Sequence, residues 1–364
     1  MSEWEYTETE LWRHGGEKSS LMHVFGVVAM ENVVLAFAEA RDGKGGDVGC
    51  IHEIWMRRSE DFGRTFAENV VICAGEGVHC WTNPVPVYDA QAKRLFLFYA
   101  DNHDNRSTEN FVVFSDDAGV TWSGPRRLNA ALEAGADPLP FHLEGPGHGI
   151  QLKKGAHAGR LIVPFWHRRY GVEKPARERG YCASILYSDD HGETWGHTEP
   201  IGQACMANES RVAETENGLV WVMRAGGNNP CRFESRSVDG GENWSEPVPQ
   251  AAGPANNCDA GVTAVRGKAP YDDMLLVSRV SWIEQRRDME ILISLDGGRT
   301  FPDVRKLAPG DAMPGYSDLC TLAEEEPVIG LVHCRSNHVL FSRISLQALT
   351  NGKYENTKRS CWLS

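Results

Sequence analysis

The chain of 364 residues lacks the features that mark several large classes of protein. It contains no run of about 18 apolar residues, so we expect no transmembrane helix and no membrane partner. Its 10 cysteines are scattered singly, without a Cys-x-x-Cys pair, which argues against a zinc site. Residues 1–13 are rich in Glu and have no apolar core, unlike a signal peptide. We therefore expect a cytoplasmic protein with free cysteines.

Basic residues are also fewer than acidic ones. The sequence has 37 Lys and Arg against 50 Asp and Glu, a formal net charge of −13. Because phosphate backbones are bound by basic surfaces, this balance argues against a nucleic-acid partner. It leaves room for an anionic ligand held in a local basic pocket.

Helical periodicity is nearly absent. The best helix candidates are residues 129–136 and 346–349, and both are short. Short apolar runs alternate instead with turn signals, and the chain contains 37 Gly and 18 Pro. This pattern predicts an all-β fold.

An eight-residue pattern, Ser-x-Asp-x-Gly-x-Thr-Trp, occurs in five complete or near-complete copies. The copies start 49 to 73 residues apart, at Ser59, Ser115, Ser188, Ser237 and Ser294. In each copy we expect a hairpin, in which Asp accepts hydrogen bonds from the turn backbone and Gly supplies a positive φ. Repeats at such intervals are typical of propeller blades.

The repeat resembles the Asp-box of sialidase-type β-propellers, in which it is structural and not catalytic. Five boxes and one unmarked blade imply a six-bladed propeller as a single domain over residues 1–364. We expect the N-terminal strands to close the ring against residues 328–344, because a closed ring hides its sheet edges.

Further stretches resemble, in the same order, the sialidases of glycoside hydrolase family 33. They are Leu35–Arg41, Asn83–Ala90, Gly145–Gly149, Glu209–Glu214 and Tyr316–Leu319. The resemblance implies a retaining exo-glycosidase with its site at the centre of the ring. Its substrate would be a glycan that ends in sialic acid or a related nonulosonic acid, and we expect no cofactor and no metal.

Such a site has a definite chemical requirement. A sialic acid carries a carboxylate on its anomeric carbon, which would repel an anionic nucleophile. The family therefore uses a Tyr activated by a Glu, with an Asp as acid and base. Three Arg bind the substrate carboxylate through planar, paired contacts.

The resemblance assigns these roles to particular residues. Tyr316 matches the nucleophile, and Glu214 matches the Glu paired with it. Asp47 matches the acid and base, with Asp42 as an alternative in the same loop. The binding residues matched by the resemblance are Arg232 (alternative Arg224), Arg286 (alternatives Arg287 and Arg279), Arg41 and Glu39. Trp81, Asn83, His148, Trp166 and Trp282 are candidates for lining the cavity.

One family motif is missing. The family's first strand carries Arg-Ile-Pro, whose Arg is central to carboxylate binding, but here the strand reads Met22–Gly26 with His23 at that position. Replacing a buried arginine that pairs with a carboxylate costs about 2–5 kcal/mol of binding. Three outcomes stay open: a weaker or acid-shifted sialidase with protonated His23, a glycosidase for a different sugar, or a glycan-binding propeller without turnover.

Overall fold

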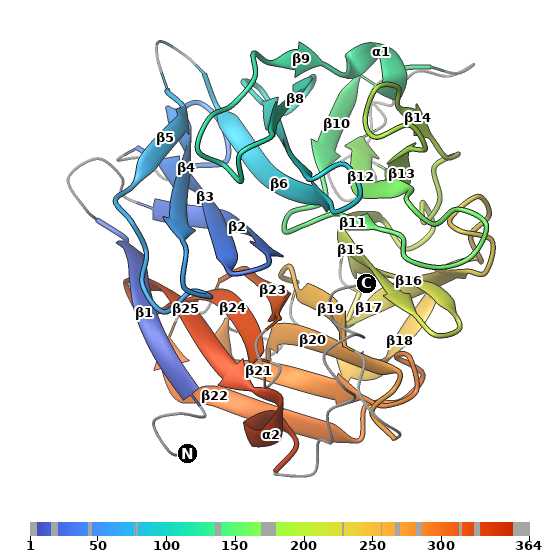
Figure 1. Ribbon diagram of the computed structural model, residues 1–364. Helices are drawn as coiled ribbons and strands as arrows, with labels where there is room; N and C mark the ends of the chain where they lie inside the picture. Colours follow the sequence, from blue (N-terminus) through green and yellow to red (C-terminus); the bar gives the residue numbers. More distant parts are fainter. Residues whose placement is uncertain are drawn as a thin grey trace.

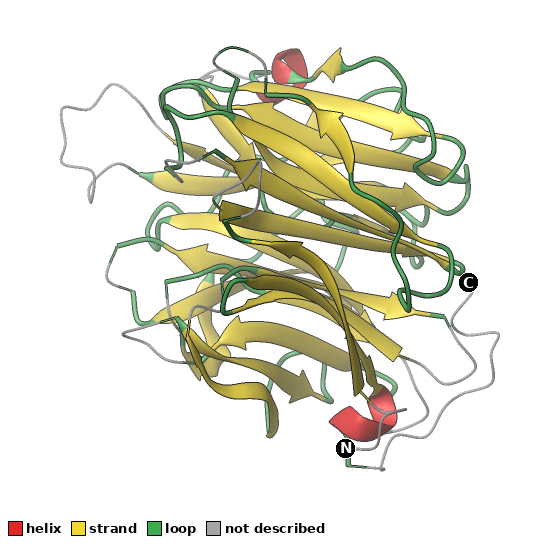
Figure 2. Ribbon diagram, turned by 90° about the vertical axis from the view of Figure 1, so that its left-hand side faces the viewer, coloured by secondary structure: helices red, strands yellow, loops and turns green. Residues whose placement is uncertain are grey.

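The computed structural model describes residues 6–351 with short gaps. The gaps are residues 16–20, 43–45, 76, 78, 135–139, 169–179, 228, 256, 266–269, 282–285, 313–314 and 324–327. The described residues form six antiparallel sheets arranged as blades around a central axis (Figure 1). Figure 2 shows the sheets in side view. In the described part of the chain, helix is confined to residues 129–132 and 346–349. The all-β, six-bladed propeller predicted from the repeats is therefore confirmed.

Each blade begins at the axis with its inner strand and continues outward. Blade 1 consists of β2 (Leu21–Met30), β3 (Val33–Arg41), β4 (His52–Ser59) and β5 (Val70–Cys73). Blade 2 consists of β6 (Trp81–Asp89), β7 (Arg94–Asp101), β8 (Glu109–Ser115) and β9 (Arg126–Arg127). Blade 3 consists of β10 (Phe141–Glu144), β11 (Ile150–Gln151), β12 (Leu161–Arg168), β13 (Tyr181–Ser188) and β14 (Gly196–His197).

The second half of the chain repeats this plan. Blade 4 consists of β15 (Ala207–Thr215), β16 (Gly218–Ala225), β17 (Cys231–Ser237) and β18 (Val248–Pro254). Blade 5 consists of β19 (Gly261–Val265), β20 (Met274–Val280), β21 (Arg287–Ser294) and β22 (Asp303–Ala312). Blade 6 consists of β23 (Ser317–Leu322), β24 (Val328–Arg335), β25 (His338–Ser345) and β1 (Tyr6–Arg13).

The ring is closed by β1, which pairs antiparallel with β25 (Figure 1). The two N-terminal strands with a clear apolar pattern, at residues 21–41, do not close the ring but belong to blade 1. The closing strand, β1, lies upstream of them. Strand β1 has few apolar residues because it is an outer edge strand, and its Glu8 and Glu10 pair with Arg335 and His338 of blade 6.

All five Asp-boxes have the predicted turn geometry. In the copy that starts at Ser115, the Ser115 Oγ accepts the Gly119 N–H at 2.8 Å, and Asp117 accepts the Thr121 N–H at 2.8 Å. Hydrogen bonds from the Thr121 hydroxyl and N–H lower the pKa of Asp117 to about 2. Each box joins the last two strands of its blade. Blade 6 has no such connection, because its third and fourth strands come from opposite parts of the chain.

The helices are α1 (Asn129–Leu132) and α2 (Leu346–Leu349), both within the predicted ranges. Ser345 caps α2 by accepting the Ala348 N–H at 3.0 Å. Among the described residues, no helix is long and apolar enough to cross a membrane. The nine cysteines in the described part of the chain are all free.

The inner strands determine where chemistry can occur. Residues at or just before the starts of β2, β6, β15 and β23 meet at one end of the central axis, where His23, Thr82, Glu209 and Tyr316 lie. Residues near the ends of the same strands, including Met30, Tyr88, Glu214 and Thr321, line a cavity at the other end. We call these regions the strand-start end and the strand-finish end.

Candidate active site

Tyr316 is the centre of a buried polar cluster at the strand-start end. Its hydroxyl donates a hydrogen bond to Glu209 Oε1, and Arg224 Nη1 donates to the Tyr316 hydroxyl oxygen at 2.9 Å. Arg224 Nη1 also pairs with Glu209 Oε2. Burial raises the pKa of Tyr316 well above its ordinary value, and the neighbouring Glu209 adds to this effect while Arg224 opposes it. The phenol therefore has both a proton acceptor and a cation in contact.

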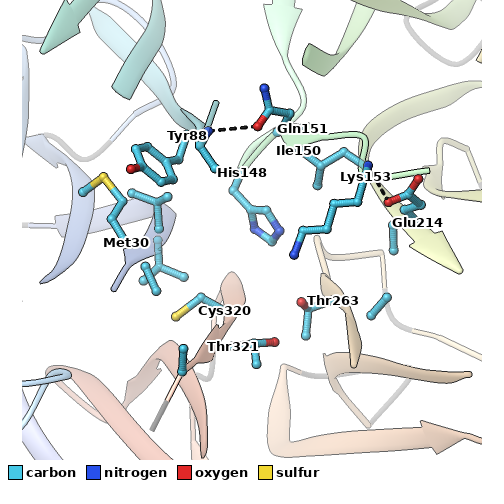
Figure 3. Close-up of a pocket in the computed structure, with 18 of the residues that line it drawn as sticks. Met30, Tyr88, His148, Ile150, Gln151, Lys153, Glu214, Thr263, Cys320 and Thr321 are labelled. Atoms are coloured by element: carbon cyan, nitrogen blue, oxygen red, sulfur yellow. Dashed lines mark hydrogen bonds between the residues drawn. The ribbon is translucent and has the colours of Figure 1, made fainter. Parts of the chain in front are cut away.

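The prediction that Glu214 pairs with Tyr316 is wrong. Its carboxylate accepts the backbone N–H groups of Lys153 at 2.9 Å and Lys154 at 3.1 Å. Glu214 lines the cavity at the strand-finish end, as Figure 3 shows. It follows Glu209 by five residues on β15, which corresponds to about 16 Å along an extended strand.

The sequence did contain a signal that separates these two glutamates. Asn217 and Gly218 follow shortly after Glu214, and Asn-Gly is a strong hairpin-turn signal. The structure turns from β15 into β16 at this point, with Thr215 opposite Gly218. Glu214 therefore had to lie at the turn end of the strand, whereas Glu209 lies near its beginning.

Asp47 is linked to the strand-start end through Arg41. Arg41 Nη1 donates to Asp47 Oδ1 at 2.8 Å, and Arg41 Nε donates to Glu39 Oε1 at 2.6 Å. The Asp47 side chain is 77% exposed, so it stands at the rim where a leaving group could meet solvent. For Asp42, the backbone N–H donates to the Ile51 carbonyl at the base of the loop.

Glu39 is a fully buried anion beneath this rim. Thr82 Oγ1 donates to Glu39 Oε2 at 2.6 Å, and His52 Nδ1 lies 2.9 Å from Glu39 Oε1. Burial alone would raise the pKa of Glu39, but Arg41, His52 and Thr82 together hold it well below its ordinary value. Glu39 is thus a permanent carboxylate that orients Arg41.

His23 packs against Tyr316, with ring centroids 4.3 Å apart and planes inclined by 45°. A β-bulge follows it between β2 and β3, and the extra residue, Val24, has φ of 50°. Burial lowers the pKa of His23 well below its ordinary value, and the charges of Arg41, Arg286 and Arg224 add to this while Glu39 opposes it. The free site therefore holds a neutral imidazole among cations.

The structure separates the arginine candidates. The Arg286 guanidinium carbon lies 5.7 Å from the centroid of the Tyr316 ring. Its alternative Arg279 pairs with Glu290 at 2.9 Å and donates to backbone carbonyls of residues 252 and 254. Arg287, the other alternative, begins β21. Arg286 is therefore the one whose contact with Tyr316 is established.

The choice of Arg232 over Arg224 is corrected. Arg232 is 3% exposed and donates Nη2 to the carbonyl oxygens of Cys258 at 2.6 Å and Asp259 at 3.2 Å. It supports the backbone behind the site, whereas Arg224 contacts the phenol directly. The two lie on adjacent strands, β16 and β17, which is why spacing alone did not distinguish them.

A buried ion network separates the two ends of the axis, and sequence reasoning missed it. Arg211 Nη2 pairs with Asp259 at 2.6 Å, and Asp318 lies between Arg211 Nε at 3.4 Å and His148 Nδ1 at 3.0 Å. Gly147 has φ of 98°, and a Cβ there would lie 1.9 Å from Arg211 Nε. The glycine-rich turn at residues 145–149 thus makes room for this arginine.

The structure places four of the five residues that were candidates for lining the cavity. Trp81 stacks on His79, Asn83 donates to the Glu144 carbonyl at 2.6 Å, and Trp166 packs on Phe141. His148 lines the cavity at the strand-finish end. Trp282 lies outside the described residues.

Comparison with known proteins agrees with this architecture. Residues 31–334 match the model of the BNR repeat-like domain. A sialidase of Micromonospora viridifaciens is 28% identical over 351 residues, which are 88% of this chain and 51% of that protein. Human sialidase-3 is 28% identical over 255 residues, which are 64% of this chain and 58% of that protein.

A solved structure is also similar. The Hadza microbial sialidase Hz136 superimposes with a TM-score of 0.79 and 26% identity, over 93% of this chain and 68% of that one. The chain therefore belongs to the BNR repeat-like domain family within the sialidase superfamily. It spans about half the length of the Micromonospora relative.

Proposed function

We propose that this protein is a retaining exo-α-glycosidase of the sialidase type, which hydrolyses a terminal sialic acid or a related nonulosonic acid. The observation that carries the proposal is the contact of Tyr316 with both Glu209 and Arg224. A buried phenol with a carboxylate acceptor and a cation on its oxygen is equipped to become a nucleophile. The named relatives, which are sialidases, support the same class.

The proposed reaction has two steps. In the first, the Tyr316 oxygen attacks the anomeric carbon as Glu209 accepts the phenolic proton, and Asp47 protonates the departing glycosidic oxygen. In the second, Asp47 accepts a proton from water, the water oxygen attacks the same carbon, and Tyr316 leaves and regains its proton from Glu209. Two displacements at one carbon return the original anomeric configuration.

Recognition of the substrate carboxylate would fall to Arg224, Arg286 and Arg41, with His23 beside them. All three arginines lie close enough to His23 for their charges to lower its pKa. A carboxylate entering this cluster would meet paired donors from planar guanidinium groups. His23 offers a single ring donor at the position where the family's Arg-Ile-Pro motif has a guanidinium, so we propose weaker or altered recognition at this position.

The test is a panel of aryl α-glycosides with and without an anomeric carboxylate, followed by NMR of the sugar first released. Release of an α-configured acidic sugar is the expected result. Release only from glycosides that lack the carboxylate would favour the second candidate, a glycosidase of altered specificity, for which His23 is the supporting observation. Binding without release would identify a glycan-binding propeller and would overturn the proposal.

A further inference from the structure

Two imidazoles and a buried carboxylate converge beside the strand-start end, outside the cluster around Tyr316. His79 Nδ1 lies 2.6 Å from Asp101 Oδ2, and His103 Nε2 lies 3.0 Å from the same oxygen. The three ligand atoms all lie within 4.8 Å of one another. We propose that His79, Asp101 and His103 form a binding site for a divalent transition metal ion, with Zn²⁺ as the best match.

The donor set fits this class of ion. Two neutral imidazoles and one carboxylate suit Zn²⁺ and its neighbours, whereas Ca²⁺ and Mg²⁺ prefer oxygen ligands. Tetrahedral zinc, with bonds of about 2.0–2.1 Å, places its ligand atoms about 3.3 Å apart. The present separations, all within 4.8 Å, would have to adjust to that spacing when the ion binds. Both side chains are a little over 40% exposed, so they can rotate and solvent can supply a fourth ligand.

Charge gives a second reason. The Asp101 side chain is 2% exposed, and its ion-pair partners among the described residues are these two histidines. A buried carboxylate is stabilised by a nearby positive charge. A divalent cation would supply it.

The ligands are already held in place by neighbouring contacts. The His79 ring stacks on Trp81, with centroids 4.8 Å apart and planes inclined by 15°. Asp101 Oδ1 accepts the Cys80 N–H at 3.0 Å, which leaves Oδ2 directed at the imidazoles. Such outer contacts fix ligand orientation in metal sites. No metal was expected from the sequence, because this trio joins the start of β6 to the end of β7 and no local pattern marks it.

The molecule offers a matched control. His191 Nδ1 lies 2.7 Å from buried Asp89, but in the described structure the other contacts of Asp89 are hydrogen bonds from the backbone at 91 and 92 and from Gln151. Asp89 is thus a buried carboxylate that contacts a single imidazole and whose oxygens already accept hydrogen bonds. It should bind Zn²⁺ no better than an ordinary surface histidine.

The experiment is titration of the full chain with ZnCl₂ by calorimetry, with Co²⁺ absorption as a spectroscopic signature of the bound site. We expect one tight site, loss of the Co²⁺ d–d bands in His79→Ala and in His103→Ala, and a Zn²⁺ affinity at least about tenfold weaker in each. His191→Ala should bind like the unmodified protein. Far-UV circular dichroism checks that each variant is folded. Equal affinity in the unmodified protein, His79→Ala and His103→Ala would overturn the proposal, which does not depend on the glycosidase assignment.

Discussion

The two ends of the central axis are built from the same inner strands, yet they differ sharply in chemistry. At the strand-start end, Tyr316 contacts Glu209 and Arg224, and Arg41 links Glu39 to Asp47. At the strand-finish end, a cavity of about 440 Å³ mixes apolar side chains with the backbone-bound Glu214 (Figure 3). The comparison shows that position along an inner strand, and not residue type alone, decides which glutamate can contact Tyr316.

The largest expected effect is at the phenol. Tyr316→Phe removes the proposed nucleophile while keeping the ring that packs on His23. We expect kcat for an aryl sialoside to fall by about 10³-fold or more, because an acid–base step alone contributes about 10²–10⁴-fold. Steady-state kinetics measures this, and near-full activity in a folded variant would end the nucleophile assignment.

Substituting Arg224 and Arg232 separately compares an arginine that contacts Tyr316 with one that only supports the backbone behind it. Arg224→Lys removes the planar guanidinium that meets Tyr316 and a substrate carboxylate, so we expect kcat/KM to fall by about 30-fold or more, which corresponds to about 2 kcal/mol. Arg232→Lys should lower thermal stability with a smaller effect on KM. A larger KM increase in Arg232→Lys than in Arg224→Lys would restore Arg232 as the residue that binds substrate.

His23 allows a test in which substrate binding should improve. His23→Arg places a guanidinium beside Tyr316, where the family's Arg-Ile-Pro motif has one. If the site is a sialidase site with weakened carboxylate recognition, KM for an aryl sialoside should fall by about tenfold or more. An unchanged or higher KM would mean that the natural ligand differs from a sialoside near C1.

The smallest expected effect concerns acid stability. Burial and nearby arginines lower the pKa of His23, so below about pH 6.5 the unfolded chain binds a proton there that the folded chain does not. Folding stability should therefore decrease as pH falls through this range, by at most about 1.4 kcal/mol per pH unit for one group. Urea unfolding between about pH 7 and pH 5 should show a shallower decrease for His23→Gln. Parallel curves for the two proteins would contradict a histidine that stays neutral in the folded protein.

The sequence predicted what depends on local chemistry. The Asp-boxes encode their own turns through short-range hydrogen bonds such as that from Gly119 to Ser115, so the fold class and blade number could be predicted. Tyr316 and Arg286 lie together at the strand-start end, and Asp47 is linked to that end through Arg41. Strand β1 escaped notice because an edge strand rich in Glu has no apolar alternation.

The errors have one physical origin. Glu209 and Glu214 lie on one strand, and Arg224 and Arg232 lie on neighbouring strands, so each choice depends on register. A shift of a few residues along a strand moves a side chain from one end of the axis to the other. Arg211 lies in blade 4, Asp318 in blade 6 and Asp259 in the connection between blades 4 and 5, so their network could not be inferred from any local pattern.

The two glutamates of β15 provide the most direct test of the account. Both should be changed to Gln, which preserves size, and kcat for an aryl sialoside should be measured beside the melting temperature of each variant. We expect Glu209→Gln to lower kcat by about 10²-fold or more and Glu214→Gln to change it by less than about twofold. A severe loss of kcat in Glu214→Gln together with normal turnover in Glu209→Gln would contradict the site described here.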